Sequence, residues 1–125
     1  MAELVDFGIT PENRECIKKL IDFKYLDQLN DGARLGAALA LRKKLYIGKN
    51  LMQVGAKMQL KTTWNKVGID PENFFHNIVN VLELCPENVG IGVRSLIILG
   101  LDYIWEKIKD KDRDTISIYD IFYDE

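Results

Sequence analysis

The three prolines of this chain all stand in the tripeptide Pro-Glu-Asn, and this repeated signal constrains the fold more than any other feature. The tripeptides cover residues 11–13, 71–73 and 86–88. Two of them follow Thr10 and Asp70, residue types that cap helix N-termini, so that proline would occupy the first helical position, where its missing N–H costs nothing. Glutamate then falls in the first turn, where the helix dipole favours negative charge. The pattern predicts helices that begin at these sites.

Apolar residues recur with helical spacing in the first half of the chain. The first predicted helix is amphipathic and covers residues 11–24. The second covers residues 31–45 and ends in three cations, which suit a helix C-terminus. Because this second segment has almost no polar side, we expect it to be the central, buried helix.

The second half of the chain predicts two further helices. One begins at Pro71 and ends near Leu84, with His76 on its polar side. The other begins near Val89 or Gly92 and runs to about residue 108, with Ser95 on its polar side. Residues 110–125 open with a charged turn and then offer isoleucines and Phe122, which predict a short docking element.

These elements define the expected fold class, which is mainly α. With 125 residues the chain should form a single domain, residues 1–125, of two packed helix hairpins. Residues 46–67 have no clear period and predict an irregular connection that can contain a short strand or hairpin. An offset of 60 positions aligns residues 8–45 with residues 68–108. This alignment is compatible with an internal repeat, or with two hairpins that merely share their starting chemistry.

The cysteines and the apolar stretches indicate the cellular compartment of the protein. Cys16 and Cys85 lack the spacing of a metal or redox motif, and we expect both to be small buried hydrophobic residues in a reducing compartment. The longest nearly apolar stretch is residues 96–101, far shorter than the roughly 20 residues that a membrane-spanning helix needs. The first residues do not resemble a secretory signal. A cytoplasmic protein with no membrane contact is predicted.

The sequence favours binding over catalysis. It carries no phosphate-binding glycine loop, no nucleophile elbow and a single histidine, His76, which is expected to be solvated. We therefore predict no catalytic residue, no metal and no cofactor. Arg34 and Arg94 lie near the starts of the two most apolar helices and are predicted to form structural ion pairs, with an anion site as the alternative reading. The candidate partners of these arginines are Asp27, Asp31 and Asp102.

Charge is the strongest functional signal. Residues 32–69 hold eight basic residues and no acidic one, so the formal charge of −2 divides into +8 there and −10 elsewhere. Basic side chains mixed with aromatic ones suit phosphate contacts with base stacking. The predicted contact residues are Arg42, Lys43, Lys44, Tyr46, Lys49, Lys57, Lys61, Trp64 and Lys66. Nucleic acid and an acidic protein surface are both candidate partners, and simple solvation of these lysines is the remaining interpretation.

Two segments carry a family resemblance. Residues 23–45 read FKYLDQLNDGARLGAALALRKKL, and residues 93–104 read VRSLIILGLDYI. Together they resemble small accessory proteins encoded in bacterial DNA-modification and anti-phage gene clusters, including DNA-phosphorothioation clusters. The resemblance implies a non-catalytic helper that works beside a nuclease, helicase or modification enzyme, and it supplies no active-site residues.

The combined expectation is a non-enzymatic accessory or binding subunit, acting in a bacterial DNA-processing or defence system. It would contact nucleic acid or an acidic partner through the basic segment, beside a larger protein subunit. The alternative is a protein adaptor or self-assembling scaffold that uses the same charge asymmetry without touching nucleic acid. Such a scaffold would form homo-oligomers.

Overall fold

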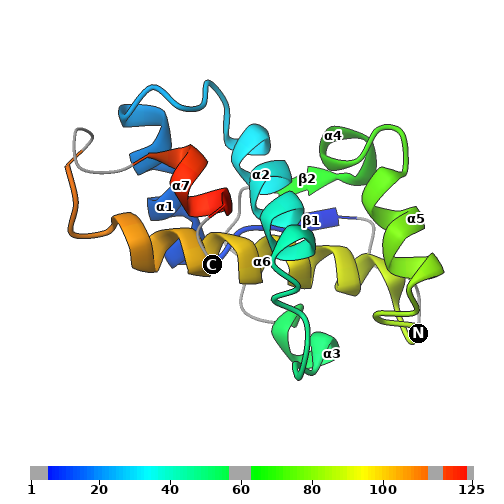
Figure 1. The fold of residues 1–125 in the computed structure, drawn as a ribbon. Helices are drawn as coiled ribbons and strands as arrows, with labels where there is room; N and C mark the ends of the chain where they lie inside the picture. The colour runs from blue at the N-terminus through cyan, green and yellow to red at the C-terminus, as the bar shows by residue number, and fades with distance from the viewer. Residues whose placement is uncertain (1–5, 57–62, 113–116, 124–125) are drawn as a thin grey trace.

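Helices dominate the part of the chain that a computed structural model describes, namely residues 6–56, 63–112 and 117–123. This confirms the mainly helical fold class of a single domain (Figure 1). In chain order the elements are β1 (Asp6–Gly8), α1 (Pro11–Asp22), α2 (Leu29–Arg42), α3 (Leu51–Val54), β2 (Thr63–Asn65), α4 (Lys66–Ile69), α5 (Phe74–Val81), α6 (Val89–Ile108) and α7 (Ile118–Tyr123).

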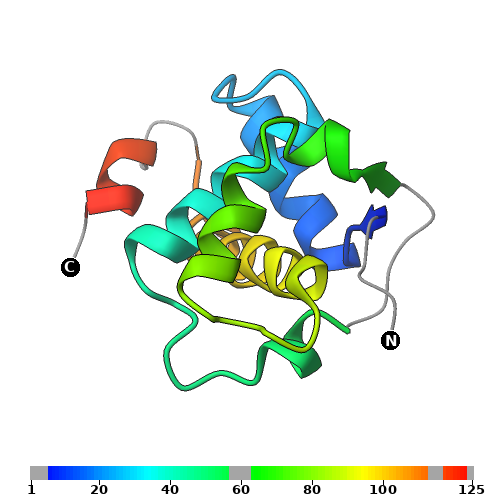
Figure 2. The same ribbon diagram turned by 90° about the vertical axis from the view of Figure 1, so that its right-hand side faces the viewer.

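The central helix is α6. It runs the length of the molecule in Figure 1 and is seen nearly end-on in Figure 2, where α1 and α2 lie above it and α3 below. Twelve of its 20 residues are buried, because it is apolar on nearly all sides and packs against α1, α2, α3 and α5. The prediction that the second helix is the central one is therefore wrong. The predicted polar position Ser95 is also wrong, since Ser95 is fully buried and donates to the Leu51 carbonyl.

Small residues let α2 cross α6 at close range. The buried side of α2 consists of glycines, alanines and one leucine. At the crossing, a Cβ atom on Gly100 would overlap the carbonyl group of Gly36, and a Cβ atom on Gly36 would lie 2.9 Å from the carbonyl oxygen of Ile97. The helices thus meet backbone to backbone, and only glycine fits at these positions.

Of the two helix starts predicted at Pro-Glu-Asn tripeptides, the one at Pro11 is confirmed, and α6 begins at Val89, one of its two predicted starts. Thr10 caps α1, where its Oγ1 accepts from the Asn13 N–H at 3.1 Å, and Asn88 caps α6. The predicted start at Pro71 is wrong, because α5 begins at Phe74 after a turn in which Asn73 has a positive φ of 58°. Asp70 still stabilises the first turn of this helix, because its carboxylate accepts a hydrogen bond from the His76 N–H at 2.9 Å.

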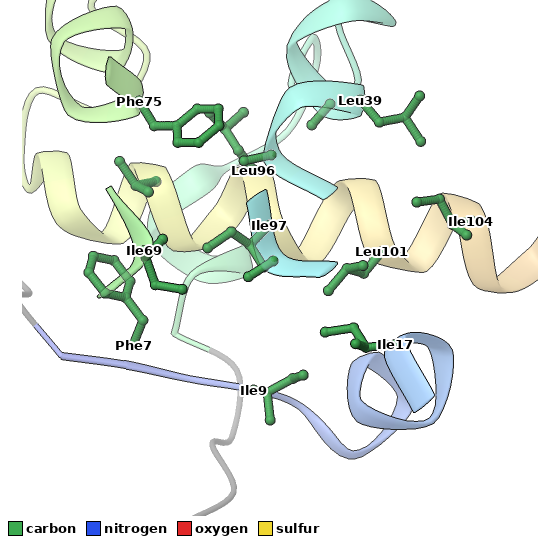
Figure 3. Close-up of a cluster of buried hydrophobic side chains, with 14 of the residues drawn as sticks. Phe7, Ile9, Ile17, Leu39, Ile69, Phe75, Leu96, Ile97, Leu101 and Ile104 are labelled. Carbon is green, nitrogen blue, oxygen red and sulfur yellow. The ribbon is translucent and has the colours of Figure 1, made fainter. Parts of the chain in front are cut away.

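The two predicted hairpins are present as α1 with α2 and α5 with α6. Both pairs contribute to a continuous core around α6, part of which appears in Figure 3 with Ile17, Leu39, Phe75, Leu96 and Leu101 among the labelled side chains. Cys16 and Cys85 are buried and unpaired, as expected. The proposed internal repeat stays a prediction.

The described part of the connection between the hairpins has regular structure. It contains α3 and β2, so the predicted short strand is confirmed. The partner of β2 is not a hairpin neighbour but β1, which pairs with it antiparallel and places Phe7 opposite Trp64. Lys57 and Lys61 lie outside the described residues.

The tail forms the predicted docking element. The short helix α7 lies at the edge of the molecule in Figure 2 and buries Ile121 against the core. Of the helices described, none combines the length and the hydropathy that crossing a membrane requires.

Candidate functional site

The C-terminal end of α2 carries the first two cations of the candidate site. Arg42 is the last residue of the helix and Lys43 is its C-cap, and Arg42 is exposed. Positive charge is favoured at this end because the last carbonyl groups of a helix carry partial negative charge. The chain then turns sharply, with a positive φ of 54° at Lys44.

Arg42 is held by the tail. Its guanidinium lies 4.1 Å from the ring centroid of Tyr123, and its Nε donates to the carbonyl oxygen of Phe122 at 3.3 Å. Tyr123 in turn lies against Tyr119, one turn earlier on α7, with ring centroids 4.5 Å apart and an angle of 35° between the rings. Both tyrosines are more than half exposed. The result is a series of planar groups at the surface.

A second cation–aromatic group lies beside the first. The ammonium group of Lys43 is 5.4 Å from the ring centroid of Tyr103, and the ammonium group of Lys107 is 5.3 Å from the same centroid. Tyr103 and Lys107 are one turn apart on α6, so both face the end of α2. We call the six residues of these two groups the basic–aromatic surface: Arg42, Lys43, Tyr103, Lys107, Tyr119 and Tyr123.

The basic–aromatic surface keeps positive charge exposed. Within the described part of the chain, no carboxylate forms a salt bridge with Arg42 or Lys107. An aromatic face attracts a cation but does not neutralise it. The acidic residue of α7, Asp120, is exposed. Arg42 and Lys107 therefore keep their positive charge toward the solvent.

Only part of the predicted contact set lies on this surface. Arg42 and Lys43 belong to it, and Lys44 and Lys49 are exposed in the turn that follows α2. Tyr46 and Trp64 are half-buried and pack against the core, with Trp64 in β2. Lys66 begins α4, but its side chain, like Lys57 and Lys61, lies outside the described residues.

Sequence reasoning missed four residues of the surface: Tyr103, Lys107, Tyr119 and Tyr123. Two signals were available in the sequence. Tyr103 and Lys107 are four residues apart on a predicted helix, and Tyr119 and Tyr123 are four residues apart in the tail, so that each pair would share one side of a helix. Neither signal says that these segments meet the end of α2, because that contact joins parts of the chain distant in sequence.

The side of α6 next to α1 carries a hollow whose charged lining residues are acidic, and Lys109 pairs with one of them, Glu106. The hollow has a volume of about 490 Å³ and is lined by Thr10, Glu12, Asp102, Trp105 and Glu106. Asp102 accepts a hydrogen bond from the Asn13 side-chain amide at 2.8 Å.

Cys16 is not a nucleophile at neutral pH. Burial, and secondly the charge of Asp102, raise the pKa of its thiol to about 12.

His76 is buried, which corrects its prediction as a solvated residue. Its Nδ1 lies 2.7 Å from Oδ2 of Asp70, its ring meets Phe7 edge-on, and its Nε2 is buried without a partner. Burial by itself raises the pKa of Asp70, but hydrogen bonds from the His76 ring and from the backbone N–H groups of His76 and Phe75 outweigh it and lower that pKa below 3.8. The pair therefore joins the turn after α4 to α5, and the contact of the His76 ring with Phe7 adds β1.

The two arginines differ in role. Arg34 forms the predicted ion pair with Asp31, at 2.7 Å, and is partly exposed. Arg94 is 1% exposed, and its described partners are the backbone carbonyl oxygens of Gly8 at 3.1 Å and Gly55 at 2.8 Å. Arg94 therefore ties β1 and α3 to the central helix.

Among the residues that the structure describes, no three or more His, Cys, Asp or Glu side chains gather in a way that could hold a metal ion. No protein-family model matches the chain, and comparisons with curated proteins and with solved structures find no match.

Proposed function

We propose that this protein is a non-enzymatic binding subunit that contacts the phosphate backbone of nucleic acid through the basic–aromatic surface. The observation that carries the proposal is the pairing of cations with tyrosines at the end of α2, where Arg42 lies on Tyr123 and where Lys43 and Lys107 flank Tyr103. Cations supply phosphate contacts, and aromatic rings hold these cations in place while offering apolar faces.

The same proposal assigns the protein to the cytoplasm, as a helper of a larger DNA-processing or defence enzyme. Two unpaired, buried cysteines, Cys16 and Cys85, suit a reducing compartment. The resemblance to accessory proteins of DNA-modification clusters supports a DNA-processing enzyme as the larger partner.

The test is the binding of labelled oligonucleotides, followed by fluorescence anisotropy over a range of salt concentrations. Three cations on the surface predict a logarithmic salt slope of about −2 for a single strand. In the double variant Arg42→Glu/Lys43→Glu we expect the affinity to fall by on the order of tenfold or more, because two attractive contacts become repulsive.

The matched control is Arg14→Glu/Lys18→Glu, which makes the same change of charge on α1, beside the acidic hollow. Its affinity should stay close to that of the wild type. Equal losses in the two double variants, or no binding at low salt, would contradict the proposal.

A second candidate function is that of a self-assembling scaffold. The exposed side of α5 favours it, because Val81 is 77% exposed, Phe74 58% and Leu82, just past the helix end, 51%. Adjacent exposed apolar side chains are typical of interaction sites. Light scattering should then report an oligomer that Val81→Asp dissociates, whether or not nucleic acid is present.

A further inference from the structure

The two tyrosines of α7 point away from the core. Tyr119 is 65% exposed and Tyr123 is 51% exposed, while Ile121, between them in sequence, is buried. Residues four apart lie on the same side of a helix, so the two rings form one aromatic face. Contiguous exposed apolar groups of this kind are typical of interaction sites.

Arg42 extends this aromatic face into a stacked series. Its guanidinium covers the Tyr123 ring at 4.1 Å, and the Tyr119 ring lies 4.5 Å from the same ring. A planar guanidinium on a ring is the arrangement that proteins use to sandwich or extend stacked bases. The ring of Tyr119 forms the open end of the series.

The phosphate contacts would come from the neighbouring group. Lys43 follows Arg42 in sequence, and both it and Lys107 hold their ammonium groups over Tyr103. Exposed rings and cations therefore lie close together at the end of α2. This combination suits a single strand, whose bases are free to stack while its phosphates meet cations.

We propose that the ligand of the basic–aromatic surface is a single-stranded polynucleotide, with an unpaired base stacked on Tyr119 at the open end of the series and with phosphates on Arg42, Lys43 and Lys107. This inference rests on the proposed function and narrows it. A duplex keeps the faces of its bases inside its own stack and offers this surface only phosphates. An acidic peptide would satisfy the cations, but its carboxylates offer no aromatic face to stack on the exposed rings.

The experiment compares one labelled oligonucleotide of about 12 nucleotides, single-stranded and as a duplex, by anisotropy at fixed salt. We expect the wild type to bind the single strand on the order of tenfold more tightly than the duplex, the contribution of about one stacked base. In Tyr119→Leu/Tyr123→Leu this affinity ratio should fall toward one. In Tyr119→Phe/Tyr123→Phe, which keeps both rings, the preference for the single strand should return.

The control is Phe23→Leu, which removes the ring of another cation–aromatic pair, with Lys19 on α1, at 5.6 Å. Its ratio should match that of the wild type. Circular dichroism establishes that each variant is folded, and the phenylalanine pair tests the inference even where the leucine pair does not fold.

The outcomes separate the two proposals. Equal affinity for single strand and duplex, or an unchanged ratio in the leucine pair, overturns the inference and leaves the proposed function standing. Binding of neither oligonucleotide overturns both. Binding of poly-glutamate but of no oligonucleotide also overturns both, and assigns the surface to an acidic protein.

Discussion

At the scale of single residues, two arginines that occupy matching positions in the two halves of the chain have different environments. Arg94 is fully buried with carbonyl partners on β1 and at the end of α3, and this burial lowers its pKa. Arg34 keeps more than a third of its side chain exposed in its pair with Asp31. Because a buried donor is much harder to replace than an exposed one, the two should differ in their contribution to stability.

We expect Arg94→Ala to lower the free energy of unfolding by about 3 to 5 kcal/mol, since two buried carbonyl groups lose their donor and a cavity remains. Arg34→Ala is the matched control and should cost less than about 1 kcal/mol, as exposed ion pairs do. Denaturation in urea measures both changes. Similar losses for the two variants would contradict the anchoring role of Arg94.

Asp70 predicts a dependence of stability on pH. Because the pKa of Asp70 is lower in the folded protein than the ordinary 3.8, its contribution is complete above about pH 4 and is lost as the pH falls through the folded-state pKa. The difference in unfolding free energy between the wild type and Asp70→Asn should therefore shrink below pH 4. In Glu72→Gln, a change in the exposed turn beside it, no such trend should appear. A difference that stays constant down to pH 2 would show that the Asp70 carboxylate is not stabilised by folding.

At the scale of elements, the approach of α2 to α6 depends on two glycines. The crossing at Gly36 and Gly100 leaves no room for a Cβ atom. Helix propensity alone would favour alanine at either position by about 1 kcal/mol. Packing and helix propensity thus have opposite effects on a glycine-to-alanine substitution here. The sign of the change in unfolding free energy shows which effect is larger.

We expect Gly100→Ala to destabilise the protein by about 1 to 3 kcal/mol, because the helices must move apart. Thermal unfolding followed by circular dichroism measures the loss, and the helical signal at low temperature should persist. An alanine variant as stable as the wild type would mean that the crossing is looser than the structure has it.

At the scale of the whole molecule, charge is unevenly distributed around α6. Arg42, Lys43 and Lys107 gather at the end of α2, and the hollow with Glu12, Asp102 and Glu106 lies on the side next to α1. Whole-chain net charge, which is −2, does not report this distribution. The field near each of these two regions is instead set by the local charges.

We therefore expect this acidic protein to be retained on a heparin column at low ionic strength and neutral pH. Arg42→Glu/Lys43→Glu should elute in the flow-through, whereas Arg14→Glu/Lys18→Glu, with the same net charge, should still be retained. Elution of the wild type without retention would show that the basic–aromatic surface is too weak or too well covered to attract a polyanion.

The sequence by itself determined the features that depend on neighbouring residues. The helical fold class, the start of α1 after the cap Thr10, the start of α6 at Val89 and the docking tail were predicted, because capping and amphipathic spacing act within one or two turns. The positive window also contains Arg42 and Lys43, two residues of the proposed basic–aromatic surface. The start of α5 was predicted wrongly at Pro71. The chain forms a turn there, with a positive φ at Asn73, and the helix begins only after it.

Only the tertiary structure decided which elements meet. It placed α6 at the centre in place of α2, buried His76 against Asp70, and brought Tyr103, Lys107 and the tail tyrosines to the end of α2. The physical reason is that such contacts join segments far apart in the chain, and their free energy depends on packing and solvent exclusion, which no local pattern of residues encodes.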